Sequence, residues 1–111
     1  MTEHVVVLVT VGDPAEARRI ARALVEERLA ACVNLIPGLA STYWWQGRVE
    51  EAGEVLLVCK TRRDRVEALE QRVRALHSYT VPEVIALPVV AGHPAYLEWV
   101  DDSLRPGSAS P

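Results

Sequence analysis

Two adjacent tryptophans, Trp44 and Trp45, lie in a segment whose composition is otherwise typical of a β-strand. Because successive side chains of a strand point to opposite faces of the sheet, the two indoles cannot enter the same core. A chain of 111 residues can cover one face of a small sheet with its own helices, and the second indole then needs other cover. We expect another copy of the chain to supply it. The alternative is that Trp45 ends the strand as a single exposed aromatic side chain.

The other predicted strands point to the same conclusion. Residues 5–9, 55–59 and 84–87 form continuous apolar runs without polar alternation. A strand with one face in water alternates between apolar and polar side chains, whereas a continuous apolar run indicates burial on both faces. We therefore predict an oligomer whose subunits pack through sheet faces or sheet edges.

The first helix is predicted from the residues at its N-terminus. A strand over residues 4–10 precedes Asp13, which is placed as the N-cap, with Pro14 at the first helical position. We expect Glu16 to reach back and complete a capping box. The apolar stripe of this helix comprises Ala17, Ile20, Ala21, Leu24, Val25 and Leu29.

A β-hairpin is predicted next. Its first strand runs through residues 32–45, with a bulge or bend at the Pro-Gly pair 37–38, since proline cannot donate to the ladder. The Gln-Gly pair 46–47 indicates a short turn, so the next strand should return antiparallel over residues 48–60. The sequence EEAG at 50–53 predicts that this strand begins irregularly.

Two helices and a strand are predicted in the second half of the chain. Apolar residues at 3-4-3 spacing predict a helix, with Thr61 and Asp64 placed to cap it. A strand over residues 83–90 follows, and a last short helix begins at Pro94. The stripe of the longer helix comprises Val66, Leu69, Val73 and Leu76. The short helix should turn Leu97 and Val100 inward, with Tyr96 and Trp99 flanking them.

The resulting order is β-α-β-β-α-β followed by a short helix. This order predicts an α+β, ferredoxin-like sandwich, in which two helices cover one face of a four-stranded antiparallel sheet. Residues 1–104 would form this single domain. Residues 105–111 would form a flexible C-terminal tail, because they offer nothing apolar to dock.

Composition and charge exclude several classes of function. The net charge is −3 with a pI near 5.6, which gives no support to nucleic-acid binding. The N-terminal residues lack a basic signal-peptide region, and no apolar stretch is long enough to span a membrane. We therefore expect a cytoplasmic protein, in which Cys32 and Cys59 are small core residues and form no disulfide.

Catalytic motifs are also missing from the sequence. It contains no G-x-x-x-x-G-K, no H-E-x-x-H and no nucleophile elbow with Ser, His and Asp in order. The first loop offers Asp13 where an acylphosphatase-like activity would want a phosphate-holding arginine. We therefore predict that the protein is not an enzyme.

Three segments resemble the CutA divalent-cation tolerance family. They are AACVNLIPG at 30–38, STYWWQGR at 41–48 and VPEVIALP at 81–88, and the resemblance extends over residues 5–104. It implies a ferredoxin-like fold, a homotrimer in which strands pack between subunits, and a cytoplasmic location. It also implies binding of copper or another divalent cation, with a role in heavy-metal tolerance.

His77 is the candidate metal ligand, because it matches the family's metal-associated histidine. The alternative is a histidine that stabilises the carbonyl groups at a helix C-terminus. This chain departs from the family at two suspected donors, with Val9 in place of a cysteine and Leu76 in place of a second histidine. Assembly of a trimer would then have to bring sparse ligands together, for example His77 with Glu83 of a neighbouring copy.

Lys60 is the only lysine in a chain with eleven arginines. We expect it to line a cleft between subunits together with Trp45, Tyr79 and Glu83, where a small anion or an acidic side chain can bind. The alternative is a solvated lysine at a strand end. This cleft supports a second hypothesis, that the protein is a regulatory or scaffolding trimer that binds a small metabolite or a protein partner.

Overall fold

The predicted order of strands and helices is confirmed in the computed structural model, which describes residues 2–107. The predicted boundary between a domain of residues 1–104 and a tail of 105–111 stays a prediction, and residues 108–111 of that tail lie outside the described part. The elements are β1 His4–Val11, α1 Pro14–Glu26, β2 Cys32–Trp45, β3 Arg48–Arg62, α2 Val66–Leu76, β4 Val84–Pro88 and α3 Pro94–Leu104.

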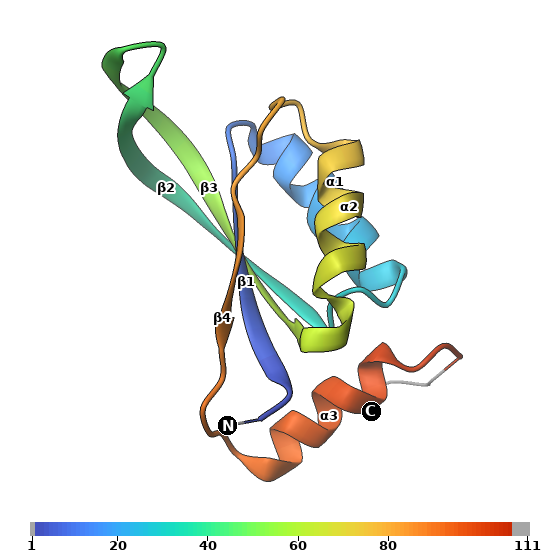
Figure 1. Ribbon diagram of the computed structural model, residues 1–111. Coiled ribbons are helices and arrows are strands. Elements are labelled where there is room, and N and C mark those ends of the chain that lie inside the picture. The colour runs from blue at the N-terminus through green and yellow to red at the C-terminus, as the bar shows by residue number, and fades with distance from the viewer. Residues whose placement is uncertain (1, 108–111) are drawn as a thin grey trace.

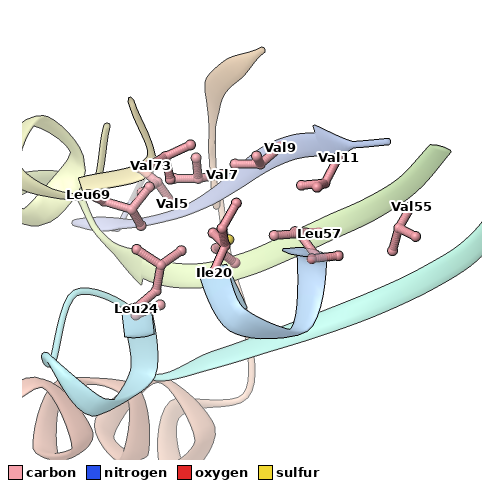
Figure 2. Packing of buried hydrophobic residues seen from close by; sticks show 13 residues of the cluster. Val5, Val7, Val9, Val11, Ile20, Leu24, Val55, Leu57, Leu69 and Val73 are labelled. Carbon is pink, nitrogen blue, oxygen red and sulfur yellow. The ribbon is translucent and has the colours of Figure 1, made fainter. Parts of the chain in front are cut away.

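The four strands form one antiparallel sheet in the order β2-β3-β1-β4. Helices α1 and α2 lie side by side on one face of it (Figure 1). The core fills the space between this face and the two helices (Figure 2). Alternate residues of β1 supply one wall of the core, and both helices supply the other. The buried set includes Val5, Val7, Val9, Val11, Ile20, Leu24, Leu57, Leu69 and Val73.

The opposite face of the sheet is also apolar. Cross-strand pairs such as Leu8 with Ile85 and Leu56 with Ile36 place apolar side chains together there. Helices α1 and α2 do not cover this surface, because both lie on the other side (Figure 1). The strands are thus apolar on both faces, as their continuous runs predicted. We call this surface the uncovered face, and it comprises Val6, Leu8, Ile36, Leu56, Val58, Ile85 and Leu87.

The β2–β3 hairpin projects beyond the rest of the sheet (Figure 1). The predicted bulge is confirmed, because the register shifts between Ile36 and Leu39 and Gly38 has a φ of 79°. The predicted two-residue turn is also confirmed. Gln46 and Gly47 both have positive φ, at 50° and 77°, which is the conformation of a type I′ turn.

The bulge decides on which face each indole lies. Before it, even-numbered residues of β2 pair with even-numbered residues of β3; after it, odd-numbered residues of β2 do so. Trp45, paired with Arg48, therefore shares a face with Leu56, whereas Trp44, paired with Val49, points to the other side. The side chains are on opposite faces as predicted, and the two residues are 75% (Trp44) and 55% (Trp45) exposed.

Three local predictions were wrong. The β3 segment 50–53 pairs regularly with β2, because the irregularity lies wholly in the β2 bulge. Glu16 does not complete a capping box: Asp13 Oδ2 accepts a bond from the Glu16 amide at 2.8 Å, but the Glu16 carboxylate binds elsewhere. Thr61 does not cap α2, because its hydroxyl donates to the Leu29 carbonyl across the core.

Helix α3 docks at the end of the sheet that carries the N-terminus (Figure 1). As predicted, Val100 is buried in its inner face. His4 is buried, and its Nε2 lies 2.8 Å from Asp101 Oδ1. Arg62 Nη1 donates to the same oxygen at 2.7 Å. Burial alone would raise the pKa of Asp101, but the hydrogen bonds from Arg62 and His4 outweigh it and lower that pKa.

Candidate functional site

A groove of about 690 Å³ lies between the β2–β3 hairpin and the segment that follows α2. The predicted cleft lies between subunits and stays a prediction; within one chain, three of its four residues, namely Trp45, Tyr79 and Glu83, line this groove. Lys60 does not line it. We call this the hairpin groove, and its lining comprises Thr10, Ser41, Thr42, Tyr43, Trp45, Glu54, Ser78, Tyr79, Thr80, Val81 and Glu83.

Tyr79 forms one wall of the groove and is held at both ends. Its hydroxyl donates to Glu54 Oε2 at 3.0 Å, and its backbone amide donates to His77 Nδ1 at 3.0 Å. Burial and the hydrogen bond to Glu54 raise the pKa of Tyr79 to about 12. Its hydroxyl also needs the glycine at position 12, because a Cβ there would lie 2.7 Å from the phenol oxygen.

His77 lies directly behind this wall, at the C-cap of α2, and its side chain is 0% exposed. Its Nδ1 accepts the Tyr79 amide bond, and its Nε2 lies 2.8 Å from the Thr10 carbonyl oxygen. A carbonyl oxygen can only accept, so Nε2 carries the proton and the ring is the neutral Nε2–H tautomer. A metal ion at either nitrogen would have to displace one of these partners. The metal role of His77 stays a prediction.

Sequence reasoning missed two carboxylates of this region. Glu16 Oε2 accepts from the amide and the hydroxyl of Ser78, each at 3.0 Å, and lies 3.5 Å from His77 Nδ1. Glu54 is only 9% exposed and anchors the Tyr79 hydroxyl. An acidic residue directly before an apolar strand run was the available signal for Glu54, since a buried carboxylate needs a partner.

Lys60 lies at the other end of the sheet. It pairs with Cys32 on β2 and with Val6 on β1, and its ammonium group contacts the Asn34 side-chain oxygen. These pairings place Lys60 on the same face as the apolar residues of the uncovered face. Lys60 is therefore half-buried beside Asn34, away from the other predicted cleft residues.

The side chains that could bind a metal ion are scattered through the structure. Among residues 2–107, no three side chains of His, Cys, Asp or Glu converge closely enough to hold a metal ion. Val9, at a suspected donor position, is fully buried in the core. Cys32 and Cys59 lie in neighbouring pairs of the β2–β3 ladder on opposite faces of the sheet. Burial, with a smaller contribution from Cys32, raises the pKa of Cys59 to about 12.

Within the described residues, no helix is both long and apolar enough to cross a membrane.

The architecture first defines a class: a split β-α-β sandwich with an extended hairpin. Two solved structures share it closely. The divalent cation tolerance protein Cut A1 from Thermus thermophilus superposes with a TM-score of 0.86 at 56% identity, covering 87% of this chain and 94% of that one. CutA from Xylella fastidiosa gives a TM-score of 0.91 at 42% identity, covering 94% and 100%.

Sequence comparison then identifies the family. Residues 5–103 match the family described as CutA1 divalent ion tolerance protein. The divalent-cation tolerance protein CutA of Thermus thermophilus is 55% identical over 98 residues, 88% of this chain and 95% of that protein. Protein CutA of Homo sapiens is 54% identical over 92 residues, and this chain spans about half of its length, 51%. The chain belongs to the CutA1 divalent ion tolerance family.

Proposed function

We propose that this protein is a cytoplasmic homotrimer that binds divalent cations, copper first among them, and contributes to tolerance of heavy metals without catalysing a reaction. The observation that carries this proposal is the family match over residues 5–103. Relatives from Thermus thermophilus and Archaeoglobus fulgidus are named divalent-cation tolerance proteins, and we extend that role to this chain.

The surface of one subunit supports assembly. The uncovered face exposes Ile36, Ile85 and Leu87, and the hairpin exposes Trp44 and Trp45. Contiguous apolar surface of this kind is typical of interaction sites, because water does not solvate it favourably. A projecting hairpin that packs on the uncovered face of the next copy would remove both surfaces from water, and three such contacts would close a ring.

The metal site would then be completed between subunits. A single chain does not converge three donors within its described residues. His77 lies behind the groove wall, and Glu83 is exposed at the groove. We propose that Cu²⁺ takes His77 after displacing the Tyr79 amide from Nδ1, with a carboxylate such as Glu83 of a neighbouring copy.

Isothermal titration with Cu²⁺ tests this proposal. We expect wild type to bind and His77→Ala to bind about tenfold more weakly or worse, since imidazole is a preferred copper donor. Glu83→Gln, which changes an exposed side chain, should weaken binding without affecting folding. His93→Ala is the matched control, because His93 is exposed and its side chain makes no capping bond. Equal affinity in folded His77→Ala and in the control would remove His77 from the site.

A second candidate function is favoured by the hairpin groove. Its volume of about 690 Å³ lies within the range of small-molecule sites, and it combines apolar walls with polar groups. We propose as the alternative that the trimer has a regulatory or scaffolding role that depends on a small ligand or a partner in this groove.

A further inference from the structure

We propose that Glu16 of the same chain is the second donor to the metal ion at His77. This inference rests on the proposed function, which places Cu²⁺ at His77 Nδ1, and it assigns to α1 the carboxylate for which Glu83 of a neighbouring copy was named. Both donors come from helix ends on the side of the sheet that carries α1 and α2 (Figure 1). The site therefore takes no donor from the hairpin or from the uncovered face.

The orientation of the His77 ring decides which nitrogen can bind. Pairing of β4 with β1 ends at Val9, and just beyond it the Thr10 carbonyl accepts the Nε2–H of His77 at 2.8 Å. A histidine that binds a metal ion usually donates its other ring N–H to a carbonyl or a carboxylate, which fixes the ring. Nδ1 therefore carries the lone pair that can bind an ion, and the Tyr79 amide occupies it at 3.0 Å.

The carboxylate of Glu16 lies close to this nitrogen. Its Oε2 is 3.5 Å from His77 Nδ1, and it projects from the first turn of α1. Two donor atoms that bind one small divalent ion at about 2.0–2.2 Å lie about 2.8–3.6 Å apart, for angles between them of about 90–110°. The observed separation falls within this range. Imidazole nitrogen and carboxylate oxygen are also donor types that bind Cu²⁺.

Ser78 holds the Glu16 carboxylate in position. Its backbone amide and its hydroxyl both donate to Glu16 Oε2 at 3.0 Å. An ionised carboxylate has about four lone-pair sites, so these two bonds leave capacity for a metal ion. The Tyr79 amide has to move away from Nδ1, and residues 78–81 are exposed and belong to no helix or strand. This segment can therefore shift to admit an ion while the helices and strands stay intact.

The negative charge of Glu16 is not balanced by a basic side chain. The residue is 8% exposed, and among residues 2–107 it forms no ion pair with a lysine or an arginine. Withdrawal of a carboxylate from water costs free energy, which hydrogen bonds from neutral donors offset only in part. A divalent ion between Glu16 and the neutral ring of His77 would supply the opposite charge.

Isothermal titration of the assembled protein with Cu²⁺, arranged as a double-mutant cycle, tests the proposal. The variants are Glu16→Gln, His77→Ala and their combination. Glutamine keeps a side-chain oxygen that can accept from Ser78, but it removes the negative charge. Glu67→Gln is the matched control, because Glu67 occupies the first turn of α2 and is exposed. Circular dichroism establishes that each variant folds, and Glu16→Asp, with its shorter side chain, replaces Glu16→Gln if that variant does not.

We expect Cu²⁺ to bind Glu16→Gln about tenfold more weakly than wild type, with Glu67→Gln unchanged. Because both donors hold one ion, the loss of affinity in the double variant should be smaller than the product of the two single losses. Equal affinity in wild type and folded Glu16→Gln, with His77→Ala weakened, would refute the role of Glu16 and leave the proposed function intact. Strictly multiplicative losses would place the two residues at separate sites and would also overturn the inference. Absence of binding to wild type, or equal affinity in wild type and His77→Ala, would refute the proposed copper site together with this inference.

Discussion

Tyr79 connects the groove to the core through two hydrogen bonds made by different parts of one residue. Its hydroxyl holds Glu54 on β3, and its amide holds His77 at the end of α2. The ring therefore has little freedom to move without breaking a contact to one of these elements. From the sequence we expected Tyr79 in a cleft with Lys60, Trp45 and Glu83, but the residue pattern contained no sign of either hydrogen bond.

Titration of Tyr79 should make stability depend on pH in the alkaline range. The folded pKa is about 12, above the ordinary tyrosine value of 10, because burial and Glu54 disfavour the phenolate. The unfolded chain loses this proton first, so the stabilisation is complete below pH 10 and is lost as the pH rises towards 12. Urea unfolding at a series of pH values should show a shallower alkaline decline in Tyr79→Phe than in wild type.

Gly12→Ala provides a second test of the raised pKa of Tyr79. The added methyl group would crowd the Tyr79 hydroxyl and move it away from Glu54, so the phenol should ionise at lower pH. Gly53→Ala is the control, because a Cβ at Gly53 would meet nothing within 4 Å. Equal phenolate titration in the two glycine variants would contradict the packing described for Tyr79.

At the scale of elements, helix α3 is fastened to the sheet by polar contacts as well as by packing. Asp101 receives hydrogen bonds from His4 on β1 and from Arg62 on β3. Arg65 Nη2 also donates to the Leu104 carbonyl at 3.0 Å, which satisfies one of the free carbonyl groups at the helix C-terminus. These contacts join the first strand to the last helix.

Asp101→Asn should loosen α3 selectively. Loss of the charged acceptor should cost about 1.5 kcal/mol, the scale of a hydrogen bond to an ionised group. Amide hydrogen exchange of α3 should then accelerate while exchange in α1 changes little. Because the pKa of Asp101 is lowered in the folded state, its stabilisation is present above the ordinary aspartate pKa and is lost as the pH falls below it. Asp102→Asn, which affects only an exposed pair with Arg105, should not reproduce the effect.

The elements were largely predictable because their signals are local. Asp13 capped α1, the Pro-Gly pair at 37–38 formed the bulge and the Gln-Gly pair at 46–47 formed the turn, as their chemistry indicated. The failures involve side chains with a choice of partner. Glu16 bonds to Ser78 and Thr61 to the Leu29 carbonyl, and both partners are distant in sequence. Most of the hairpin groove could not be predicted for the same reason, because its two walls come from segments that are distant in sequence and that only the fold brings together.

At the scale of the whole molecule, one subunit is elongated, with extents of 45 × 27 × 23 Å. The hairpin accounts for much of this shape, since its far end extends past the sheet (Figure 1). The uncovered face and the exposed Trp45 are consequences of a sheet that has helices α1 and α2 on one side only, whereas Trp44 is exposed because the hairpin projects beyond these helices (Figure 1). Their burial requires a partner, and the proposed trimer supplies it.

A carboxylate introduced among the apolar residues of the uncovered face should prevent assembly of the trimer. Leu87→Glu would place a carboxylate in the proposed contact, where it would be desolvated without a partner. Sedimentation velocity at micromolar concentration should show a trimer for wild type and smaller species for this variant. Val25→Glu, on the exposed side of α1, is the matched control and should remain assembled. A wild-type chain that sediments as a folded monomer would refute the trimer.

The bulge at residues 37–38 has a practical consequence for spectroscopy. Trp44 and Trp45 are neighbours in the chain, yet the register places them on opposite sides of the hairpin, and only Trp45 lines the groove. With the other indoles replaced, fluorescence from position 45 would report events inside the groove, and fluorescence from position 44 would report those on the far side. The chain thus carries two optical sensors, one residue apart, that face different environments.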